Sequence, residues 1–464
     1  MTTDIATNSS SSLNIAIIGA GIGGLGFAIG LSHLSIPFTI YESAPAFSAV
    51  GAGVGLGPNA LRAMDLIDTH FRDAYMNIAT GNLRPEKRHV MMEAMRMEEG
   101  FGEGEDWFGN GRGEWGGRGF ERTGAHRKDL LDIMTGFIDG EKVRFRKRVV
   151  RMTQRDGEVT LTFDDGDIAV HDAVVACDGV KGSSRRVVLG DRFPEAVEPV
   201  YTGKYVYRAI LPMQDAKSIL GDLATDAKMF MAKDANVSTY PISEGREMNV
   251  VAFKRDEGEW RGKEFTVEVE REEMYAQPLR WGIFHHPHTP TYYSSLICLL
   301  GDVAHASGPH QGAGAGQCLE DALILSRVLG KLVSSTPSNI LTPSSPDQKL
   351  ERARIIKVAF QAYDEIRRPR AQEQVRTTNE CGEIYNLRLG EEIPDRDGDG
   401  DIVAAVRNLK GRFRWIWEHD LEGDVRKVES RWGDGGEAAR KEKEMRVNGG
   451  VKVGSGNRVH EVAR

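Results

Sequence analysis

The order of apolar and polar positions near the N-terminus predicts a compact β-α-β unit. Residues 13–19 are apolar apart from Asn14, which predicts a buried strand. Residues 21–34 predict a helix, and residues 37–42 predict a second strand. Two strands joined in this way are parallel and have a right-handed crossover. We therefore expect a parallel sheet in this part of the chain.

Later segments alternate between sheet-like and helix-like patterns. Residues 142–171 alternate apolar and polar positions around Asp156-Gly157 and Asp165-Gly166, which predicts hairpins. Residues 200–253 are rich in β-branched and aromatic residues and predict a largely antiparallel second sheet. Short buried strands are expected at 174–177 and 296–300, and helices at 317–332 and 348–376. Residues 98–124 and 433–464 are rich in glycine and charge, so we expect a mobile loop and a poorly ordered tail.

Composition narrows the class of protein. The 464 residues carry 60 Lys and Arg against 68 Asp and Glu, and this net charge of −8 argues against a broad nucleic-acid or anionic-membrane surface. The four cysteines, at positions 177, 298, 318 and 381, are scattered, so no disulfide framework or metal site is expected. Residues 13–34 are interrupted by six glycines, which disfavours a membrane span. We expect a reduced, cytoplasmic setting.

The turn between the first strand and helix carries a nucleotide-binding motif. Gly19-Ala20-Gly21-Ile22-Gly23-Gly24 matches G-x-G-x-x-G and lies between a strand and a helix. In this motif Gly19 permits the tight turn, Gly21 lets the backbone approach a pyrophosphate, and Gly24 allows close packing of helix and strand. Glu42 ends the second strand, where an acid can accept hydrogen bonds from ribose hydroxyls. These residues predict a dinucleotide site without separating FAD from NAD.

Two further polar residues follow the expected elements. Arg127 lies in Ala125-His126-Arg127-Lys128-Asp129-Leu130 and opens a helix, where its guanidinium can reach cofactor oxygens. Asp178 follows a buried strand, at the edge where parallel sheets bind ligands. An ordinary Asp-Gly turn is the alternative for Asp178.

A third segment decides the cofactor. Gly301-Asp302 ends a buried strand, and Gly312-Ala313-Gly314-Ala315-Gly316 precedes a helix. Asp302 can hydrogen-bond a ribityl hydroxyl, and the backbone N–H groups around Gly314 and Ala315 can lie against a flat ring system. A flexible glycine linker would explain neither the strand nor the helix beside it.

In this order and spacing the motifs resemble the class A FAD-dependent aromatic hydroxylases, and more narrowly the fungal branch similar to salicylate hydroxylases, which includes polyketide phenol monooxygenases. The resemblance runs from about residue 15 to residue 421 and includes Tyr201-Thr202-Gly203-Lys204-Tyr205-Val206-Tyr207-Arg208, Thr239-Tyr240-Pro241-Ile242 and Trp415-Ile416-Trp417-Glu418. It implies flavin contacts at Glu42, Gly55, Arg127, Asp302 and Ala315. It also implies that Arg208 and Tyr240 bind and activate the substrate.

The resemblance implies an α/β fold. We expect a Rossmann-like FAD-binding domain in two parts (13–195 and 291–330), an inserted, mainly antiparallel β-sheet substrate domain (196–290), C-terminal helices (331–430) and a disordered tail (431–464). NADH or NADPH would serve as a transient reductant, and O2 would supply the oxygen for a phenolic ring. The sequence leaves open whether the protein is a monomer or a homodimer.

Alternatives remain at the level of the sequence. The substrate could be a polyketide phenol of fungal secondary metabolism, which we favour, or salicylate, which would lose CO2 and give catechol. The family usually has serine where this chain has Gly182, and its relatives carry an extra helix between Glu272 and Leu300. That second difference allows a catalytically impaired flavin-binding relative. A flavin-free NAD-binding reductase is the alternative from another class.

Overall fold

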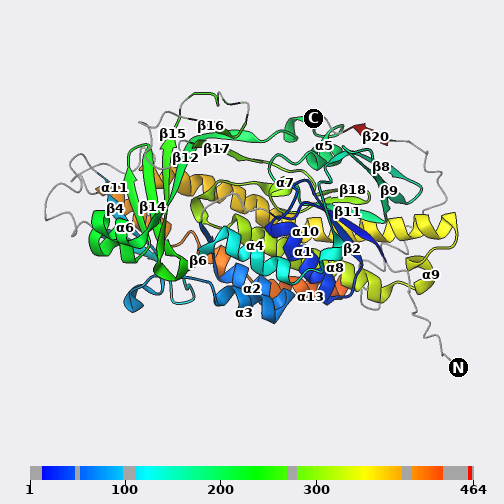
Figure 1. Cartoon of the computed structure of the whole chain (residues 1–464), viewed down its shortest axis with the longest axis horizontal. Coiled ribbons are helices and arrows are strands. Elements are labelled where there is room, and N and C mark those ends of the chain that lie inside the picture. The colour runs from blue at the N-terminus through cyan, green and yellow to red at the C-terminus, as the bar shows by residue number, and fades with distance from the viewer. Residues whose placement is uncertain are drawn as a thin grey trace.

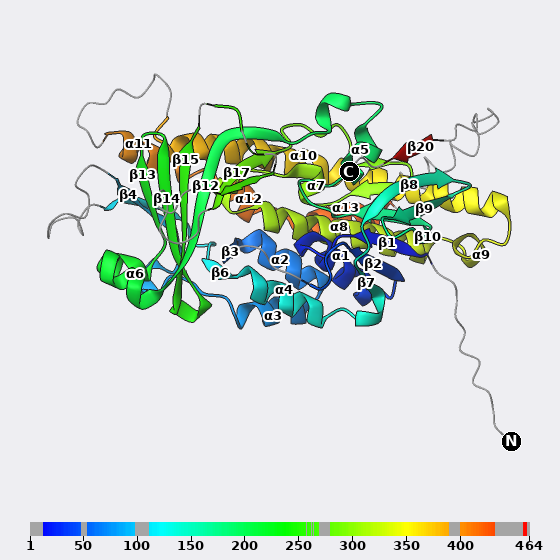
Figure 2. The same ribbon diagram turned by 45° about the horizontal axis from the view of Figure 1, so that its top comes forward.

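The computed structural model describes residues 13–47, 53–97, 111–256, 258–260, 262, 264–268, 279–388, 400–431 and 458–461. A parallel sheet with its helices forms one end of an elongated molecule, and a large antiparallel sheet forms the other (Figure 1). The 40-residue helix α10 (Pro346–Tyr385) runs between the two ends (Figures 1 and 2).

The mainly parallel sheet has six strands in the order β18-β19-β11-β1-β2-β7. Its central strand β1 (Ile15–Ile18) is fully buried and pairs in parallel with β2 (Phe38–Glu42) and with β11 (Ala173–Ala176). The chain returns much later to add β19 (Ile297–Leu299) in parallel beside β11. The edges are β18 (Tyr293–Ser294) and β7 (Val143–Phe145). The predicted β-α-β unit and both predicted buried strands are confirmed.

Glycines let two helices approach each other beside this sheet. Helix α1 (Ile22–His33) follows β1 and packs on α8 (Gly314–Ser335). A Cβ at Gly30 would lie 2.7 Å from Ser326 Oγ, and a Cβ at Gly26 would lie 3.2 Å from Leu319 Cδ2. Four-residue spacing places both glycines on the face of α1 that meets α8. This contact fixes α8 relative to the glycine turn.

A smaller sheet has four strands in the order β10-β9-β8-β20. The predicted hairpins are confirmed: β8 (Val149–Arg155), β9 (Glu158–Phe163) and β10 (Ile168–His171) are antiparallel neighbours. The glycines of both predicted turns, Gly157 and Gly166, have positive φ. Of the predicted tail, the structure describes residues 458–461, where β20 (Arg458–Glu461) pairs with β8.

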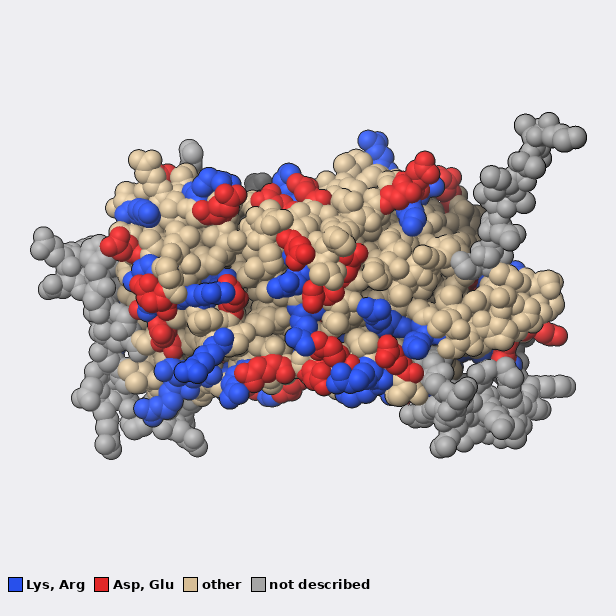
Figure 3. Space-filling model, turned by 90° about the horizontal axis from the view of Figure 1, so that it is seen from below, with Lys and Arg blue, Asp and Glu red and all other residues tan. Residues whose placement is uncertain are grey.

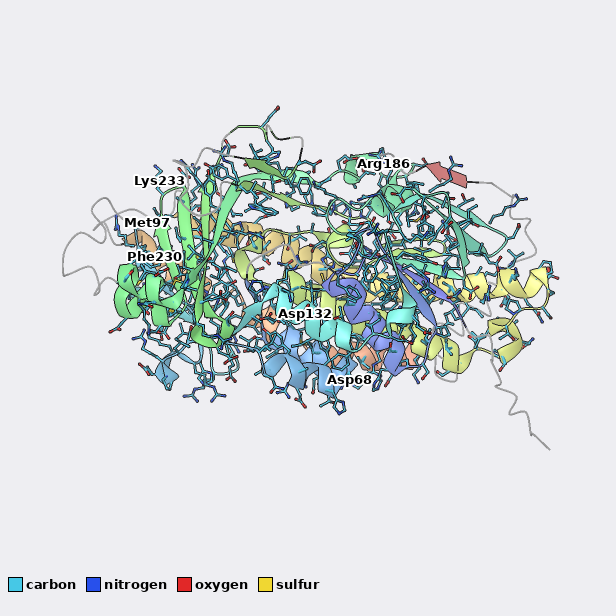
Figure 4. The ribbon with its side chains drawn as sticks, viewed as in Figure 1. Asp68, Met97, Asp132, Arg186, Phe230 and Lys233 are labelled. Carbon is cyan, nitrogen blue, oxygen red and sulfur yellow. The ribbon has the colours of Figure 1, made fainter. Side chains whose placement is uncertain are left out.

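The second sheet has eight strands, and as predicted it is largely antiparallel. Their order is β16-β17-β12-β15-β14-β13-β4-β5. The bounds are β4 (Val90–Arg96), β5 (Gly111–Gly116), β12 (Val200–Pro212), β13 (Lys228–Ala232), β14 (Ala235–Ile242), β15 (Glu247–Arg255), β16 (Thr266–Glu268) and β17 (Leu279–His285). Figure 4 shows Phe230 and Lys233 at the end of the molecule that this sheet forms.

The prediction of a mobile loop over residues 98–124 is wrong for the second half of this segment. Strand β5 pairs with β4, and its Trp115 is buried and stacks on Tyr385 of α10, with ring centroids 5.8 Å apart. Burial of this large aromatic side chain stabilises β5 despite the surrounding glycines. Residues 98–110 lie outside the described part of the chain.

Helices cover the two sheets and connect them. They are α2 (Pro58–Ile67), α3 (Thr69–Met76), α4 (Arg127–Gly136), α5 (Ser184–Leu189), α6 (Met213–Leu220), α7 (Asp302–His305), α9 (Ser338–Leu341), α11 (Gly400–Leu409), α12 (Arg414–Trp417) and α13 (Leu421–Arg431). Both predicted later helices exist, but α8 begins at residue 314 and α10 extends over residues 346–385. A two-stranded sheet of β3 (Gly53–Leu56) and β6 (Thr123–His126) lies between the two large sheets.

The charged side chains at the surface and the hydropathy of the described helices bear on whether a helix spans a membrane. Positive and negative side chains are interspersed on the face in Figure 3. Among the helices that the structure describes, none is both long and apolar enough to span a membrane.

A buried ion-pair network, which we call the α8–α10 clamp, joins α8 to α10. It consists of Arg367, Glu320 and Asp321, whose side chains are inaccessible to solvent. Arg367 Nη1 donates to Glu320 Oε2 at 2.6 Å, and its Nε donates to Asp321 Oδ1 at 2.8 Å. Arg370 adds two hydrogen bonds to Glu320 at 2.7 and 2.9 Å. Burial disfavours ionisation of Glu320, but the two arginines hold the pKa of this carboxyl below its usual value.

We expect Arg367→Met to lower the free energy of unfolding by about 3–5 kcal/mol, because it leaves two buried carboxylates short of a counter-charge. Arg376→Gln is the matched control, since Arg376 lies on the same helix but pairs with Glu373 and Glu380 at the surface. It should cost no more than about 1 kcal/mol. Urea titration followed by circular dichroism measures both. Equal costs in the two variants would contradict the importance of the clamp.

Candidate functional site

The glycine turn after β1 has the geometry that its motif predicts. Gly19 has φ +98°, and a Cβ there would lie 2.6 Å from the carbonyl oxygen of Cys177. A Cβ at Gly24 would lie 2.1 Å from the carbonyl oxygen of Gly19. Gly21 differs, because its backbone is extended and nothing lies within 4 Å of a Cβ built on it. The fold therefore requires Gly19 and Gly24, whereas Gly21 keeps open space at the N-terminus of α1.

The side chain of Glu42 holds this turn in place. Its Oε2 accepts a hydrogen bond from the backbone N–H of Ala20 at 2.8 Å, and its Oε1 accepts one from Ala44 at 2.8 Å. The carboxylate thus braces the residue between the first two motif glycines. It lies at the end of β2, as the sequence predicts, and its observed bonds are to the backbone.

A cavity of about 490 Å³ extends from the glycine turn to the eight-stranded sheet. Eight of the residues predicted from the sequence line it: Gly21, Gly55, Arg127, Arg208, Tyr240, Asp302, Gly314 and Ala315. Four predicted residues are not part of its lining: Gly19, Gly24, Glu42 and Asp178. The cavity therefore joins residues that are far apart in the sequence and that come from both large sheets.

Asp178 lies beside the cavity and braces the loop before α5. Its Oδ2 accepts from the backbone N–H of Ser184 at 3.0 Å, its buried Oδ1 has no partner among the described residues, and burial raises the pKa of this carboxyl. A Cβ at Gly182 would lie 2.4 Å from Asp178 Oδ1. Glycine at position 182 therefore leaves the space that this carboxylate occupies.

The loop of residues 301–316 forms the middle of the cavity wall. The α8–α10 clamp holds its beginning, because Asp321 Oδ2 accepts from the Gly301 N–H at 3.1 Å and bonds His305 Nε2 at 2.6 Å. Thr378 of α10 holds its centre, because its Oγ1 donates to the Gly308 carbonyl at 2.9 Å. Nothing lies within 4 Å of a Cβ built on Gly312. The loop is thus anchored from behind, and at Gly312 its surface is open.

One face of the eight-stranded sheet forms the far wall. Pairing places Arg208 of β12, Val251 of β15, Ser238 of β14 and Met229 of β13 in a single row, and all four line the cavity. Tyr240 lies two residues along β14, on the same face. The alternation of side chains along each strand therefore brings Arg208 and Tyr240 to one wall.

Arg208 is a half-buried cation without a carboxylate partner among the described residues. Its guanidinium lies 5.4 Å from the ring centroid of Trp281. Burial lowers the pKa of the Arg208 guanidinium. The nearby Tyr240 opposes this shift, whereas the positive charge of Arg127 increases it. Tyr240 is itself buried, which raises the pKa of its hydroxyl despite Arg122 and Arg208, so the phenol is neutral at pH 7. A cation and a neutral hydroxyl donor can together bind an anionic oxygen.

Sequence reasoning missed Arg122. It directly precedes β6, lines the cavity and lies 4.6 Å from the ring centroid of Tyr240. The only sequence signal was a charged residue at the end of a segment predicted to be a mobile loop. Sequence reasoning also missed four apolar residues of the cavity, because no local sequence pattern relates them to the site: Met91, Met92, Phe120 and Tyr385.

Comparison with known proteins identifies the family. The chain is 37% identical over 441 residues to an FAD-dependent monooxygenase of Gibberella moniliformis, covering 90% of this chain and 96% of the relative. The chain belongs to the FAD-dependent monooxygenases. A 6-methylsalicylate 1-monooxygenase of Aspergillus terreus is 34% identical over 436 residues, covering 89% of this monooxygenase and 91% of the relative. No family model matches the sequence.

A solved structure supports the same assignment. A salicylate hydroxylase in complex with its substrate superimposes on this monooxygenase with a TM-score of 0.74 and 27% identity. The superposition covers 90% of this chain and 98% of that chain. The predicted fold, family and cofactor are confirmed, and this monooxygenase uses FAD.

The residues of the cavity fit this cofactor. The open space at Gly21 lies at a helix N-terminus, which attracts phosphate. The open loop surface at Gly312 lines the same cavity, as does the row of Arg208. A dinucleotide that spans both points would need a continuous cavity, and the lining residues provide one.

We expect Gly19→Ala to destabilise the FAD-free protein and Gly21→Ala to weaken FAD binding. Gly19→Ala forces a left-handed backbone on alanine, at about 1–3 kcal/mol, and adds a clash with Cys177, so the FAD-free protein should melt earlier. Gly21→Ala should leave the FAD-free melting temperature unchanged and weaken FAD at least about 10-fold, because its methyl group enters the ligand space. Thermal unfolding and FAD titration measure both. Wild-type FAD affinity in Gly21→Ala would contradict this account of the turn.

Proposed function

We propose that this monooxygenase hydroxylates the ring of an ionised phenol, in fungal secondary metabolism. The observation that carries the proposal is the unpaired Arg208 at the wall of the cavity that also contains the 301–316 loop. A half-buried guanidinium that finds no acid within the described protein favours an anionic ligand. The fungal relatives, one of them named for 6-methylsalicylate, support the substrate class.

The proposed cofactor contacts follow the cavity. The turn at Gly19, Gly21 and Gly24 would hold the pyrophosphate, and Glu42 would position this turn and the ribose. Arg127 and Asp302 would bind the part of FAD between phosphate and ring. The run at Gly314 and Ala315 would lie along the ring, with Gly55 opposite. Asp178 supports the loop before α5 and acts on the cofactor only through that backbone.

FAD, reduced by NADH or NADPH, would activate O2 and supply an electrophilic oxygen atom. The chain's own task is to present a nucleophilic ring. Arg208 would stabilise the phenolate through charge-assisted hydrogen bonds, and neutral Tyr240 would donate its O–H to the same oxygen. Apolar side chains such as Met229 and Phe253 exclude water from the ring.

Two substrates satisfy this proposal. A polyketide phenol would use Arg208 and Tyr240 for its phenolate and the apolar wall for its alkyl or acyl groups, and we favour it. Salicylate would be hydroxylated with loss of CO2. A FAD-loaded sample tests both: NAD(P)H oxidation is measured with salicylate and with alkylated resorcinol aldehydes, and products are identified by mass. FAD binding without stimulation by any phenol would instead indicate a catalytically impaired relative.

We expect Arg208→Ala to lower kcat/KM about 100-fold or more, since it removes the cation that stabilises the phenolate. Tyr240→Phe should cost about 10- to 100-fold, the value of one hydrogen bond to a charged oxygen. Arg246→Gln is the control, because Arg246 lies at the β14–β15 turn and pairs with Glu244 at the surface. Steady-state kinetics measure all three variants.

The pKa of the bound phenol provides a second readout. Arg208 favours the ionised form, so the bound phenol should have a lower pKa in the wild type than in Arg208→Ala. The phenolate absorbance band should therefore persist to lower pH in the wild-type complex. A bound phenol with the same pKa in both proteins would contradict the role of Arg208.

A further inference from the structure

Arg122 has an unusual environment for a structural arginine. Its side chain is buried, at 7% exposure, yet it lines the cavity. Its Nη1 donates to the carbonyl oxygen of Met91 at 2.5 Å, the single hydrogen bond that the guanidinium makes to the described residues. A guanidinium has five N–H donors, so most of them find no acceptor there.

The charges around Arg122 do not balance within the described protein. Burial lowers its pKa to about 10, and the groups that oppose this shift are the hydroxyls of Tyr240, Tyr75 and Tyr385. No carboxylate of the described residues pairs with it. The only acidic residue in the cavity lining, Asp302, belongs to the 301–316 loop. A buried cation without an acid is costly unless a ligand supplies the negative charge.

The position of Arg122 relative to Tyr240 determines where a negatively charged ligand group would bind. Its guanidinium stacks on the Tyr240 ring at 4.6 Å, and a cation–π contact of this kind fixes the plane of the fork. A Cβ built on Gly53 would lie 3.2 Å from Tyr240 Cε2, and one built on Gly124 would lie 3.6 Å from Tyr240 Cδ2, so the backbone of both glycines borders this ring. The cavity thus contains two cations, Arg122 and Arg208, that each act on Tyr240 electrostatically.

We propose that Arg122 is a specificity-determining residue that binds a second acidic oxygen group of the aromatic substrate, a carboxylate or a second ionisable phenol, while Arg208 and Tyr240 hold the reacting phenolate. This inference rests on the proposed function and narrows its substrate class. The preferred ring carries two oxygen substituents that share negative charge. A phenol with only one such group would leave Arg122 without a counter-charge and would bind more weakly.

The test compares matched ligands in FAD-loaded protein. Dissociation constants come from the change in flavin absorbance on binding. Salicylate against salicylamide tests a carboxylate, and 2,4-dihydroxybenzaldehyde against 2-hydroxy-4-methoxybenzaldehyde tests a second phenol. In the wild type the acidic member of one pair should bind more tightly. Arg122→Gln should reduce that preference about 10- to 100-fold, the value of a hydrogen bond to a charged group.

Two further variants separate binding from structure. Arg122→Lys keeps the charge and should retain part of the preference, and it replaces Arg122→Gln if the latter does not hold FAD. Arg88→Gln is the control, because the Arg88 carbonyl oxygen accepts from the Arg122 backbone N–H but the Arg88 side chain pairs with exposed Glu121. If Arg122 only joined β4 to β6, Arg122→Gln would lower the melting temperature and weaken both members of each pair equally. That result would overturn the inference.

Failure of the proposed function has a different signature. In that case no phenol stimulates NAD(P)H oxidation, whichever residue occupies position 122. Benzoate and benzamide lack the phenol and therefore measure the Arg122 contact independently of turnover. Tighter binding of benzoate to the wild type than to Arg122→Gln, with benzamide unchanged, supports the inference. Equal benzoate affinities in the two proteins, with no preference lost in either phenol pair, would overturn it.

Discussion

The buried pairing of Arg367 with Glu320 and Asp321 is the interaction on which the rest of the site depends. It fixes α8 to α10 in the interior, and the same two carboxylates hold three other parts of the chain. Asn59 of α2 donates to Glu320 at 2.7 Å, and the N–H of Gly301 donates to Asp321 at 3.1 Å. Arg370, bound to Glu320, also donates to the carbonyls of Trp415 and Ile416 at 2.9 Å. Because Arg367 pairs with both carboxylates, its displacement would affect the 301–316 loop through Asp321 and α12 through Glu320 and Arg370.

This arrangement separates the charges of the molecule into two groups. With Arg370 included, the clamp contains two cations and two anions in balance, and each carboxylate oxygen there has a partner. The end of the cavity around Tyr240 contains Arg122 and Arg208 without paired acids among the described residues. Balanced charge suits a rigid support, because every buried group is satisfied. Unbalanced charge suits a binding site, because the ligand completes it. Helix α10 connects the two regions, since it carries Arg367 at its middle and Tyr385 at its end.

The sequence predicted the parts of this structure that depend on local rules. The turn at Gly19 and Gly24 follows from steric limits within a few residues, and the hairpins around Gly157 and Gly166 follow from alternation and turn chemistry. The strand β5 was not predicted, because its stability comes from Trp115 packing on Tyr385, 270 positions later in the numbering. Arg122 was missed for a similar reason. Its relation to Tyr240 exists only after β6 and β14 meet, and no local pattern records that contact.

Two carboxylates show how prediction from motif position can be right about place and incomplete about role. Glu42 and Asp178 both follow strands of the parallel sheet, at the edge where ligands bind. Both accept hydrogen bonds from backbone N–H groups, Glu42 from Ala20 and Asp178 from Ser184. An acid in such a position shapes the loop before it meets a ligand, so its substitution changes the backbone as well as the contact. The loss of cofactor in a Glu42 variant would therefore measure turn geometry and ribose binding together. Gly21 separates the two, because a Cβ built on it would meet no described residue within 4 Å and would enter the open space of the cavity.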